Sequence, residues 1–348
     1  MKSRSNKHHR KKEKNKTKKC KNPPVFHTNS LKNKRPVIGI LTIPVSKHKL
    51  YKSHKKKLSY LPSSYVKWIE MSGAKVLPIP LHWSKKKILS ILKQVNGVLF
   101  PGGSIDRSTV LDYYQYTVSY KLIFDYAKKQ KSFALFSICL GFEYMLILSK
   151  MNPTDIIKKE IVDNDYESLL RDKLNAGHQN VSLNIIDNKN NSLFFKDFRS
   201  CDFDYFKKKC IYMNHHYGLL FNKENKKKFN DEIDILSTNK DKDGLEYIST
   251  IQFKKYPFFG TQWHPEKPLF EWGDEKITHS LLAKHISQKV SSMFISECQK
   301  NKNVLVDQNL LINYYTLYSR KQVMHIIDPA HKNKKNSSIF EECYYFTT

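Results

Sequence analysis

The sequence predicts an α/β fold: a doubly wound, mostly parallel sheet flanked by helices and extended by antiparallel strands. Two observations lead to this prediction. The first half of the 348-residue chain alternates short apolar runs with segments of helical spacing, which is typical of a parallel sheet with crossover helices. The second half instead holds successive strand-like runs, with Asp243-Gly244 as a hairpin-turn signal.

The first half supplies the parallel part of the predicted sheet. Four apolar runs have the length of buried strands, and they are residues 35–42, 76–81, 97–100 and 133–138. Three segments between them have helical spacing, and they are residues 63–71, 85–94 and 113–129. We expect Ser63 or Ser64 to cap the first helix and Gly73 to follow its end. Prolines 78 and 80 place the second strand at a sheet edge or a strand end.

The second half is expected to extend this sheet with mixed or antiparallel strands. Its strand-like runs are residues 181–186, 233–238, 246–253 and 258–263. Residues 276–299 then have the spacing of a surface helix whose inner face includes Leu281, His285 and Ile286. We therefore expect one folded domain over residues 35–348.

The positive charge is spread along the whole chain. The formal net charge is +29, and residues 1–35 contribute 14 Lys or Arg against one acid, Glu13. Residues 1–34 hold almost no apolar side chains, so we expect a disordered basic tail. Because no groove-reading motif accompanies the charge, nucleic acid is not expected as a partner.

No apolar run approaches the roughly 18 residues that span a bilayer, so no membrane span is expected. The first thirty residues contain no readable secretory signal, which favours a cytoplasmic location. The six cysteines form no CxxC pair, so the sequence has no zinc-site signature.

Residues 133–143 are the stretch around which the site is organised. An apolar strand pattern there meets Cys139, and helical spacing resumes directly after Gly141. A strand that turns sharply into a helix around one small nucleophile is the elbow geometry of hydrolases. The helix N-terminus should shift the Cys139 thiol toward thiolate, and the N–H of Leu140 is a candidate oxyanion donor. The alternative is a buried structural cysteine.

Two further groups should meet Cys139 at one edge of the sheet. His264 follows the strand at residues 258–263 and can act as general acid and base for a thiol, while Glu266 can orient its imidazole. Gly102 and Gly103 follow another strand, where backbone N–H groups can point at a developing oxyanion. Each group alone is also typical of an ordinary loop, and their order along the chain is what makes the pattern specific.

The order PGGS (101–104), CLGFE (139–143), QWHPEK (262–267) resembles the class I glutamine amidotransferase-like superfamily. Within it the chain is most similar to the gamma-glutamyl hydrolases, over most of residues 35–348. This resemblance implies Cys139 as nucleophile, His264 as general acid and base, and Glu266 as the third member of a triad.

The resemblance also implies roles for residues around the triad. The backbone of Gly102 or Gly103, together with Leu140, matches the oxyanion hole. His216 resembles a second active-site histidine that contacts substrate, although a surface histidine is the alternative. Glu143 could receive the α-amino group of a terminal glutamate, or it could stabilise the first helical turn.

The implied function is a cysteine hydrolase that cleaves γ-glutamyl bonds, with folylpoly-γ-glutamates as substrate class, no cofactor and a possible homodimer. The family's location would be lysosomal, vacuolar or extracellular. Ser137 departs from the glycine that usually stands at this position, which could weaken the enzyme. Two alternatives are a glutaminase-type amidotransferase subunit and a weakened binding protein whose basic tail contacts nucleic acid.

Overall fold

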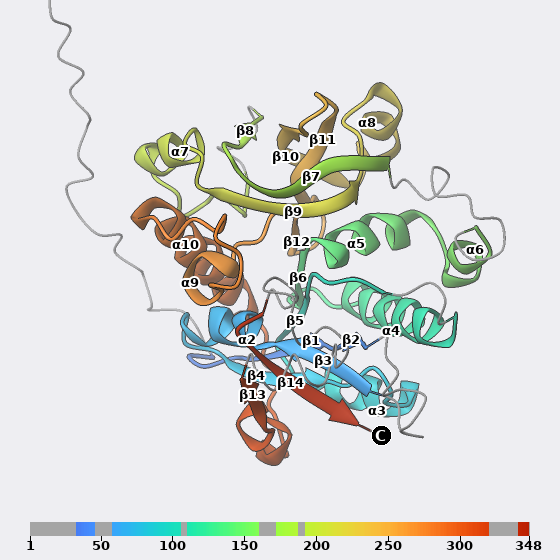
Figure 1. Cartoon of the computed structure of the whole chain (residues 1–348). Coiled ribbons are helices and arrows are strands. Elements are labelled where there is room, and N and C mark those ends of the chain that lie inside the picture. Colours follow the sequence, from blue (N-terminus) through green and yellow to red (C-terminus); the bar gives the residue numbers. More distant parts are fainter. Residues whose placement is uncertain are drawn as a thin grey trace, which may run out of the picture.

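The computed structural model describes residues 33–45, 58–105, 110–159, 172–186, 192–319 and 340–347. The prediction of a disordered tail at residues 1–34 therefore lies, except for Asn33 and Lys34, outside the described residues. Figure 1 shows a central sheet with helices on both sides and two smaller sheets beside it.

The central sheet has eight strands, and the predicted fold class is confirmed. In spatial order they are β4 (Lys75–Ile79), β1 (Val37–Leu41), β5 (Gly97–Phe100), β6 (Ala134–Ile138), β12 (Phe258–Thr261), β11 (Glu246–Phe253), β10 (Ile233–Lys240) and β8 (Asn184–Ile185). The first five run parallel, and the last three extend the sheet antiparallel. β4, which carries Pro78, lies at the sheet edge as predicted.

Helices bury both faces of this sheet. Successive residues of a strand point to opposite faces, so Val37 and Leu41 of β1 join one core while Ile38 and Ile40 join the other. The helices that pack into the first core are α3 (Lys85–Leu92), α4 (Val110–Lys128), α5 (Leu140–Lys150) and α6 (Pro153–Ile157). Those of the second core are α2 (Ser63–Glu70), α7 (Ser200–Phe206) and α10 (Leu281–Cys298).

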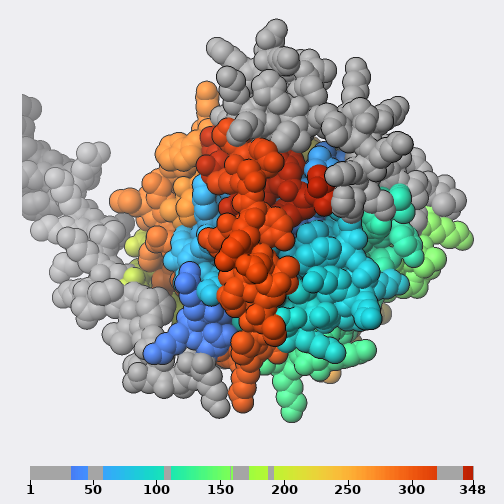
Figure 2. Space-filling model, turned by 90° about the horizontal axis from the view of Figure 1, so that it is seen from below, coloured from blue at the N-terminus to red at the C-terminus, as the bar shows by residue number. Residues whose placement is uncertain are grey.

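Two smaller sheets join segments that lie far apart in sequence. One has the order β13 (Leu317–Ser319), β14 (Glu342–Thr347), β3 (Leu58–Pro62), β2 (Ile43–Pro44). Figure 2 shows the resulting C-terminal segment, orange to red, lying across the blue and cyan N-terminal elements. The other is a ribbon of β7 (Asp172–Val181) and β9 (Ile211–Gly218), which arches beside α5 and β12 in Figure 1. The remaining short helices are α8 (Lys223–Phe229), α9 (Lys267–Phe270), η4 (Gln308–Leu310) and η5 (Ile312–Tyr314).

The start of α2 differs from the prediction. Pro62 is the N-cap residue and no side chain caps the helix, so the assignment of Ser63 or Ser64 as N-cap is wrong. The Ser63 hydroxyl instead donates to Glu342 of β14 at 3.2 Å. Gly73, at φ 89°, follows the helix end as predicted.

Two element boundaries in the second half also differ. The predicted strand at 181–186 is divided, because residue 181 ends β7 while β8 belongs to the central sheet. The predicted helix at 276–299 begins only at Leu281, since the Ser280 hydroxyl caps it by accepting from the Ala283 N–H. Leu281 is 83% exposed rather than on the inner face.

Candidate active site

Cys139 lies at the turn between β6 and α5, as the elbow pattern predicted. Its backbone has φ 51° and ψ −110°, a conformation that residues other than glycine rarely adopt. Close packing maintains this turn, because a Cβ on Gly141 would lie 2.5 Å from the carbonyl oxygen of Phe100. A strained residue in so tight a turn indicates that the surrounding sheet holds Cys139 in place.

Ser137 is accommodated by the strand beside it. It is fully buried, and its hydroxyl donates to the Phe259 carbonyl at 3.2 Å. The residue opposite on β12 is Gly260, where a Cβ would lie 2.8 Å from the Ser137 hydroxyl oxygen. The serine that departs from the family pattern therefore occupies space left by a neighbouring glycine.

Cys139, His264 and Glu266 meet at the carboxyl end of β6 and β12. A Cβ on Gly102 would lie 2.9 Å from the Cβ of Cys139 and 3.0 Å from the Cε1 of His264, so both side chains border one point. Nδ1 of His264 is 2.7 Å from Oε1 of the fully buried Glu266. The Cys139 thiol donates to the carbonyl of Asn214, at a sulfur–oxygen distance of 3.9 Å.

The electrostatics of this site favour a neutral thiol and a neutral imidazole. Burial, followed by the charges of Glu143 and Glu266, raises the pKa of the Cys139 thiol, although the Leu140 N–H acts in the opposite direction. Burial lowers the pKa of His264 although Glu266 opposes this change. The predicted shift of Cys139 toward thiolate is therefore wrong for the free protein, because burial and two carboxylates outweigh the helix N-terminus.

The two glycines after β5 have different surroundings, which bears on whether their N–H groups can serve an oxyanion. The Gly102 N–H donates to the Tyr65 hydroxyl at 2.9 Å, so this donor is already engaged. Gly103 is bordered by apolar Ile43 and the Tyr60 hydroxyl. Leu140 follows Cys139 as the first residue of α5, where backbone N–H groups have no partner within the helix.

The two histidines of β9 lie on opposite faces of the strand. His216, which the sequence favoured, is exposed, and its Cε1 would lie 3.0 Å from a Cβ on Gly177. His215 is buried, and its Nδ1 contacts the Tyr217 carbonyl at 2.8 Å. Burial lowers the pKa of His215 to about 3, and the charge of His264 also lowers it. His215 is therefore a neutral histidine near the triad, in the segment where the sequence favoured its neighbour His216.

Glu143 is buried in the first turn of α5. Its Oε1 accepts a hydrogen bond from the Gln262 side chain at 3.2 Å, which joins α5 to the segment that carries His264. The negative charge of Glu143 also acts on Cys139. Glu143 therefore lies in the first helical turn and beside the nucleophile, while its contact with a substrate α-amino group stays a prediction.

Three further side chains beside the triad were not singled out from the sequence. They are Tyr65 of α2, Tyr212 of β9 and Lys267 of α9. The Lys267 ammonium lies 5.7 Å from the centre of the Tyr212 ring, and its charge lowers the pKa of both Cys139 and His264. Lys267 ends the motif at residues 262–267 that carried the resemblance, so a search of that motif for polar side chains could have found it.

Within the part of the chain that the structure describes, no group of three or more His, Cys, Asp or Glu side chains could hold a metal ion. No helix among the described residues has both the length and the apolar character that a membrane crossing needs.

Comparison with known proteins identifies several relatives. A sequence profile of the family described as Peptidase C26 matches residues 36–266. Gamma-glutamyl hydrolase B from Dictyostelium discoideum is 33% identical over 325 residues, covering 87% of this chain and 86% of that protein. Gamma-glutamyl hydrolase 1 from Arabidopsis thaliana is 33% identical over 297 residues, covering 82% and 79%. Gamma-glutamyl hydrolase from Homo sapiens is 28% identical over 321 residues, covering 90% of each chain.

Proposed function

Because this chain belongs to the Peptidase C26 family, we propose that it is a cysteine hydrolase that cleaves γ-glutamyl bonds. The main support from the site is the convergence of Cys139 and His264 around Gly102, with Glu266 bonded to Nδ1 of the imidazole. This arrangement supplies a nucleophile, a base and a group that orients the base.

In the first half of the proposed reaction, Cys139 Sγ attacks the γ-carbonyl carbon while His264 takes the thiol proton. The base and the nucleophile both start neutral, so proton transfer accompanies the attack rather than preceding it. Glu266 stabilises the imidazolium that forms. His264 then gives this proton to the leaving amine, the carbon–nitrogen bond breaks, and a γ-glutamyl thioester remains on Cys139.

In the second half, water attacks the thioester carbonyl and His264 takes a proton from that water. The carbon–sulfur bond breaks, the thiol of Cys139 is restored, and a free γ-carboxylate leaves. The N–H of Leu140 and the N–H of Gly103 are the proposed oxyanion donors, since Gly102 already donates to Tyr65. Each such donor contributes about 10²–10³-fold to the rate in well-studied cases.

We propose folylpoly-γ-glutamates as the substrate class. Each residue of such a chain adds one carboxylate, and the net charge of +29 would raise its rate of encounter in a salt-sensitive way. His216 and Glu143 are the proposed substrate contacts. The homodimer, the cytoplasmic location and the basic tail at residues 1–34 remain predictions.

The test is hydrolysis of a pteroyl-γ-oligoglutamate by the full chain, with product lengths read by chromatography. We expect cleavage that is lost in Cys139→Ala and in His264→Ala. Cys210→Ala is the matched control, since Cys210 is a buried free thiol that contacts a backbone carbonyl outside the site. Release of ammonia from glutamine without cleavage of the γ-linked chain would instead identify a glutaminase. Cleavage that survives Cys139→Ala would overturn the proposed mechanism.

A further inference from the structure

A second strained side chain lies beside the candidate active site, on β7. Among the described residues, His178 and Cys139 are the only ones other than glycine with positive φ, and His178 has φ 49°. The pairing of β7 with β9 shifts register between Ala176 and Gln179, which leaves one extra residue on β7. A bulge of this kind turns a side chain in a new direction, and bulges are common next to active sites.

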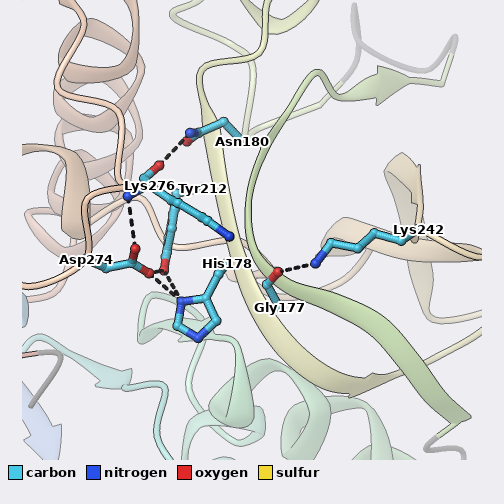
Figure 3. Close-up of polar contacts among 7 residues, drawn as sticks. All are labelled: Gly177, His178, Asn180, Tyr212, Lys242, Asp274 and Lys276. Carbon is cyan, nitrogen blue, oxygen red and sulfur yellow. Dashed lines mark hydrogen bonds and ion pairs between the residues drawn. The ribbon is translucent and has the colours of Figure 1, made fainter. Parts of the chain in front are cut away.

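The His178 ring makes its polar contacts through one nitrogen, Nδ1. Its Nδ1 contacts Oδ2 of Asp274, and the Tyr212 hydroxyl donates to the same carboxylate oxygen (Figure 3). The hydroxyl also lies 3.4 Å from His178 Nδ1. Figure 3 shows the other ring nitrogen pointing away from Asp274, and the side chain is 45% exposed. With Nδ1 committed to the carboxylate, Nε2 is the ring nitrogen that is left to meet a ligand.

A positive charge lies beside the bulge. The Lys242 ammonium donates to the carbonyl of Gly177 at 2.9 Å, as Figure 3 shows, and a lysine has two further N–H donors. The imidazole of His216 also borders Gly177. The acid beside His178, Asp274, already accepts from Tyr212, His178 and the Lys276 backbone N–H. Two further acids flank Lys242, and both are engaged, since Asp241 accepts from the backbone N–H groups of Asn175, Asp243 and Leu245 and Asp243 accepts from the Asn175 side chain. The outward donors of this cluster therefore suit an anion.

Tyr212 joins the cluster to the triad. Its backbone carbonyl accepts from the backbone N–H of His264 at 3.1 Å, and its ring centre lies 6.2 Å from that of His264. Its hydroxyl lies within electrostatic range of Cys139 and Glu266, whose charges contribute to raising the pKa of Tyr212 after burial and Asp274. Tyr212 thus connects the pair of His178 and Asp274 to the triad.

Resting on the proposed function, we propose that His178, held by Asp274 and assisted by Lys242, binds an α-carboxylate of the γ-glutamyl chain. The bound residue is a neighbour of the one whose γ-carbonyl meets Cys139. A γ-linked chain carries an α-carboxylate on every residue, whereas a single glutamine offers none beyond its own. The cluster would therefore favour γ-linked chains over single residues, because it binds an α-carboxylate that only a chain supplies.

The test measures binding, so that it does not depend on turnover. The ligand is fluorescein-labelled γ-pentaglutamate, and the protein is the full chain carrying Cys139→Ala. We expect His178→Asn to raise the dissociation constant about tenfold or more, because a hydrogen bond to a charged group is lost. Asparagine tolerates the left-handed backbone at this position, so the fold should be retained, and thermal unfolding checks this. Lys242→Gln and Asp274→Asn should weaken binding in the same direction.

Two controls separate this site from general attraction of a polyanion. Lys86→Gln removes the same charge from the exposed side of α3, far from β7 in Figure 1, and should change binding less than twofold. A pentaglutamate whose α-carboxylates are carboxamides should bind the Cys139→Ala protein about tenfold more weakly than pentaglutamate does. Adding His178→Asn should not weaken the binding of this carboxamide chain further.

The outcomes distinguish this proposal from the proposed function. In one outcome, His178→Asn leaves the dissociation constant of pentaglutamate unchanged. In another, it raises the dissociation constants of pentaglutamate and of the carboxamide chain by the same factor. Either result overturns the carboxylate site even if the wild-type protein cleaves. The absence of pentaglutamate binding overturns it as well. Binding that depends on His178, in a protein whose wild type cleaves no γ-glutamyl bond, supports the carboxylate site and refutes the hydrolase.

Discussion

The elbow at Cys139 and the bulge at His178 share a left-handed backbone but differ in what surrounds it. Cys139 lies between a strand of the central sheet and a buried helix, and its side chain is buried. His178 lies on a two-stranded ribbon, and its side chain is half exposed. Strain at the elbow is held by packing on every side, whereas strain at the bulge is held mainly by hydrogen bonds to Asp274 and Tyr212. The first arrangement suits a reacting atom, and the second suits a contact that can adjust to ligand.

The largest expected effect is at the elbow itself. Cys139→Ala should lower kcat/KM by at least about 10⁴-fold, because the nucleophile is lost. Cys139→Gly should be equally inactive but more stable than Cys139→Ala by about 1 kcal/mol, since glycine accepts positive φ. Steady-state kinetics and urea unfolding measure the two effects. Equal stability of the two variants would show that the elbow stores little strain.

Gly102→Ala should lower kcat/KM by about 10²-fold, because its Cβ would displace both Cys139 and His264. The control is Gly73→Asn, at a left-handed position with nothing within 4 Å, where asparagine is tolerated. It should keep wild-type kcat/KM. Full activity in Gly102→Ala would mean that the two side chains do not meet at this point during the reaction.

The pH dependence of kcat/KM tests whether Cys139 and His264 are both neutral in the free protein. Because burial lowers the pKa of His264, kcat/KM should stay level through pH 6.5, the ordinary imidazole value, and fall about tenfold per unit only at lower pH. The sign follows from the mechanism, since a protonated His264 cannot accept the thiol proton. Lys267→Met removes a nearby positive charge and should move this limb to higher pH. An acid limb that begins above pH 6.5 would contradict the neutral pair.

Gly260→Ala should lower the free energy of unfolding by about 1–3 kcal/mol, because its Cβ would meet the Ser137 hydroxyl and the Phe142 ring. Urea unfolding measures the loss. Ser137→Gly in the same chain should recover part of it, since one of the two contacts is removed. No recovery in the double variant would mean that Phe142 alone accounts for the cost.

The smallest effect is expected at the bulge. His178→Gly relieves the backbone strain but loses the contacts to Asp274 and Tyr212, so its unfolding free energy should change by less than about 1 kcal/mol. Thermal and urea unfolding measure it. A loss as large as that of Gly260→Ala would show that the bulge is a structural element rather than an adjustable contact.

Local pattern was sufficient wherever neighbouring residues decide the conformation. The strand, the small nucleophile and the helix around Cys139 follow one another in the chain, so their geometry could be predicted. The same holds for His264 and Glu266, which are two residues apart. The parallel order of the strands followed from the alternation of strand and helix, and it brought these residues to one edge.

Long-range contacts were not predictable in this way. The hydroxyl of Ser63 bonds to Glu342 rather than capping its own helix, because the fold places β14 beside it. Tyr212 and His215 reach the site on β9, a strand that the sequence reasoning did not propose. Whether Ser137 is tolerated depends on Gly260, its partner on another strand.

The sequence by itself determined the fold class, the elbow and the identity of the candidate triad, because each depends on residues close together in the chain or on simple alternation. Only the tertiary structure decided the protonation of Cys139, the engagement of Gly102 with Tyr65 and the place of His178 beside the site. The physical reason is that burial and partner charges arise from packing between distant segments, and no local pattern specifies them.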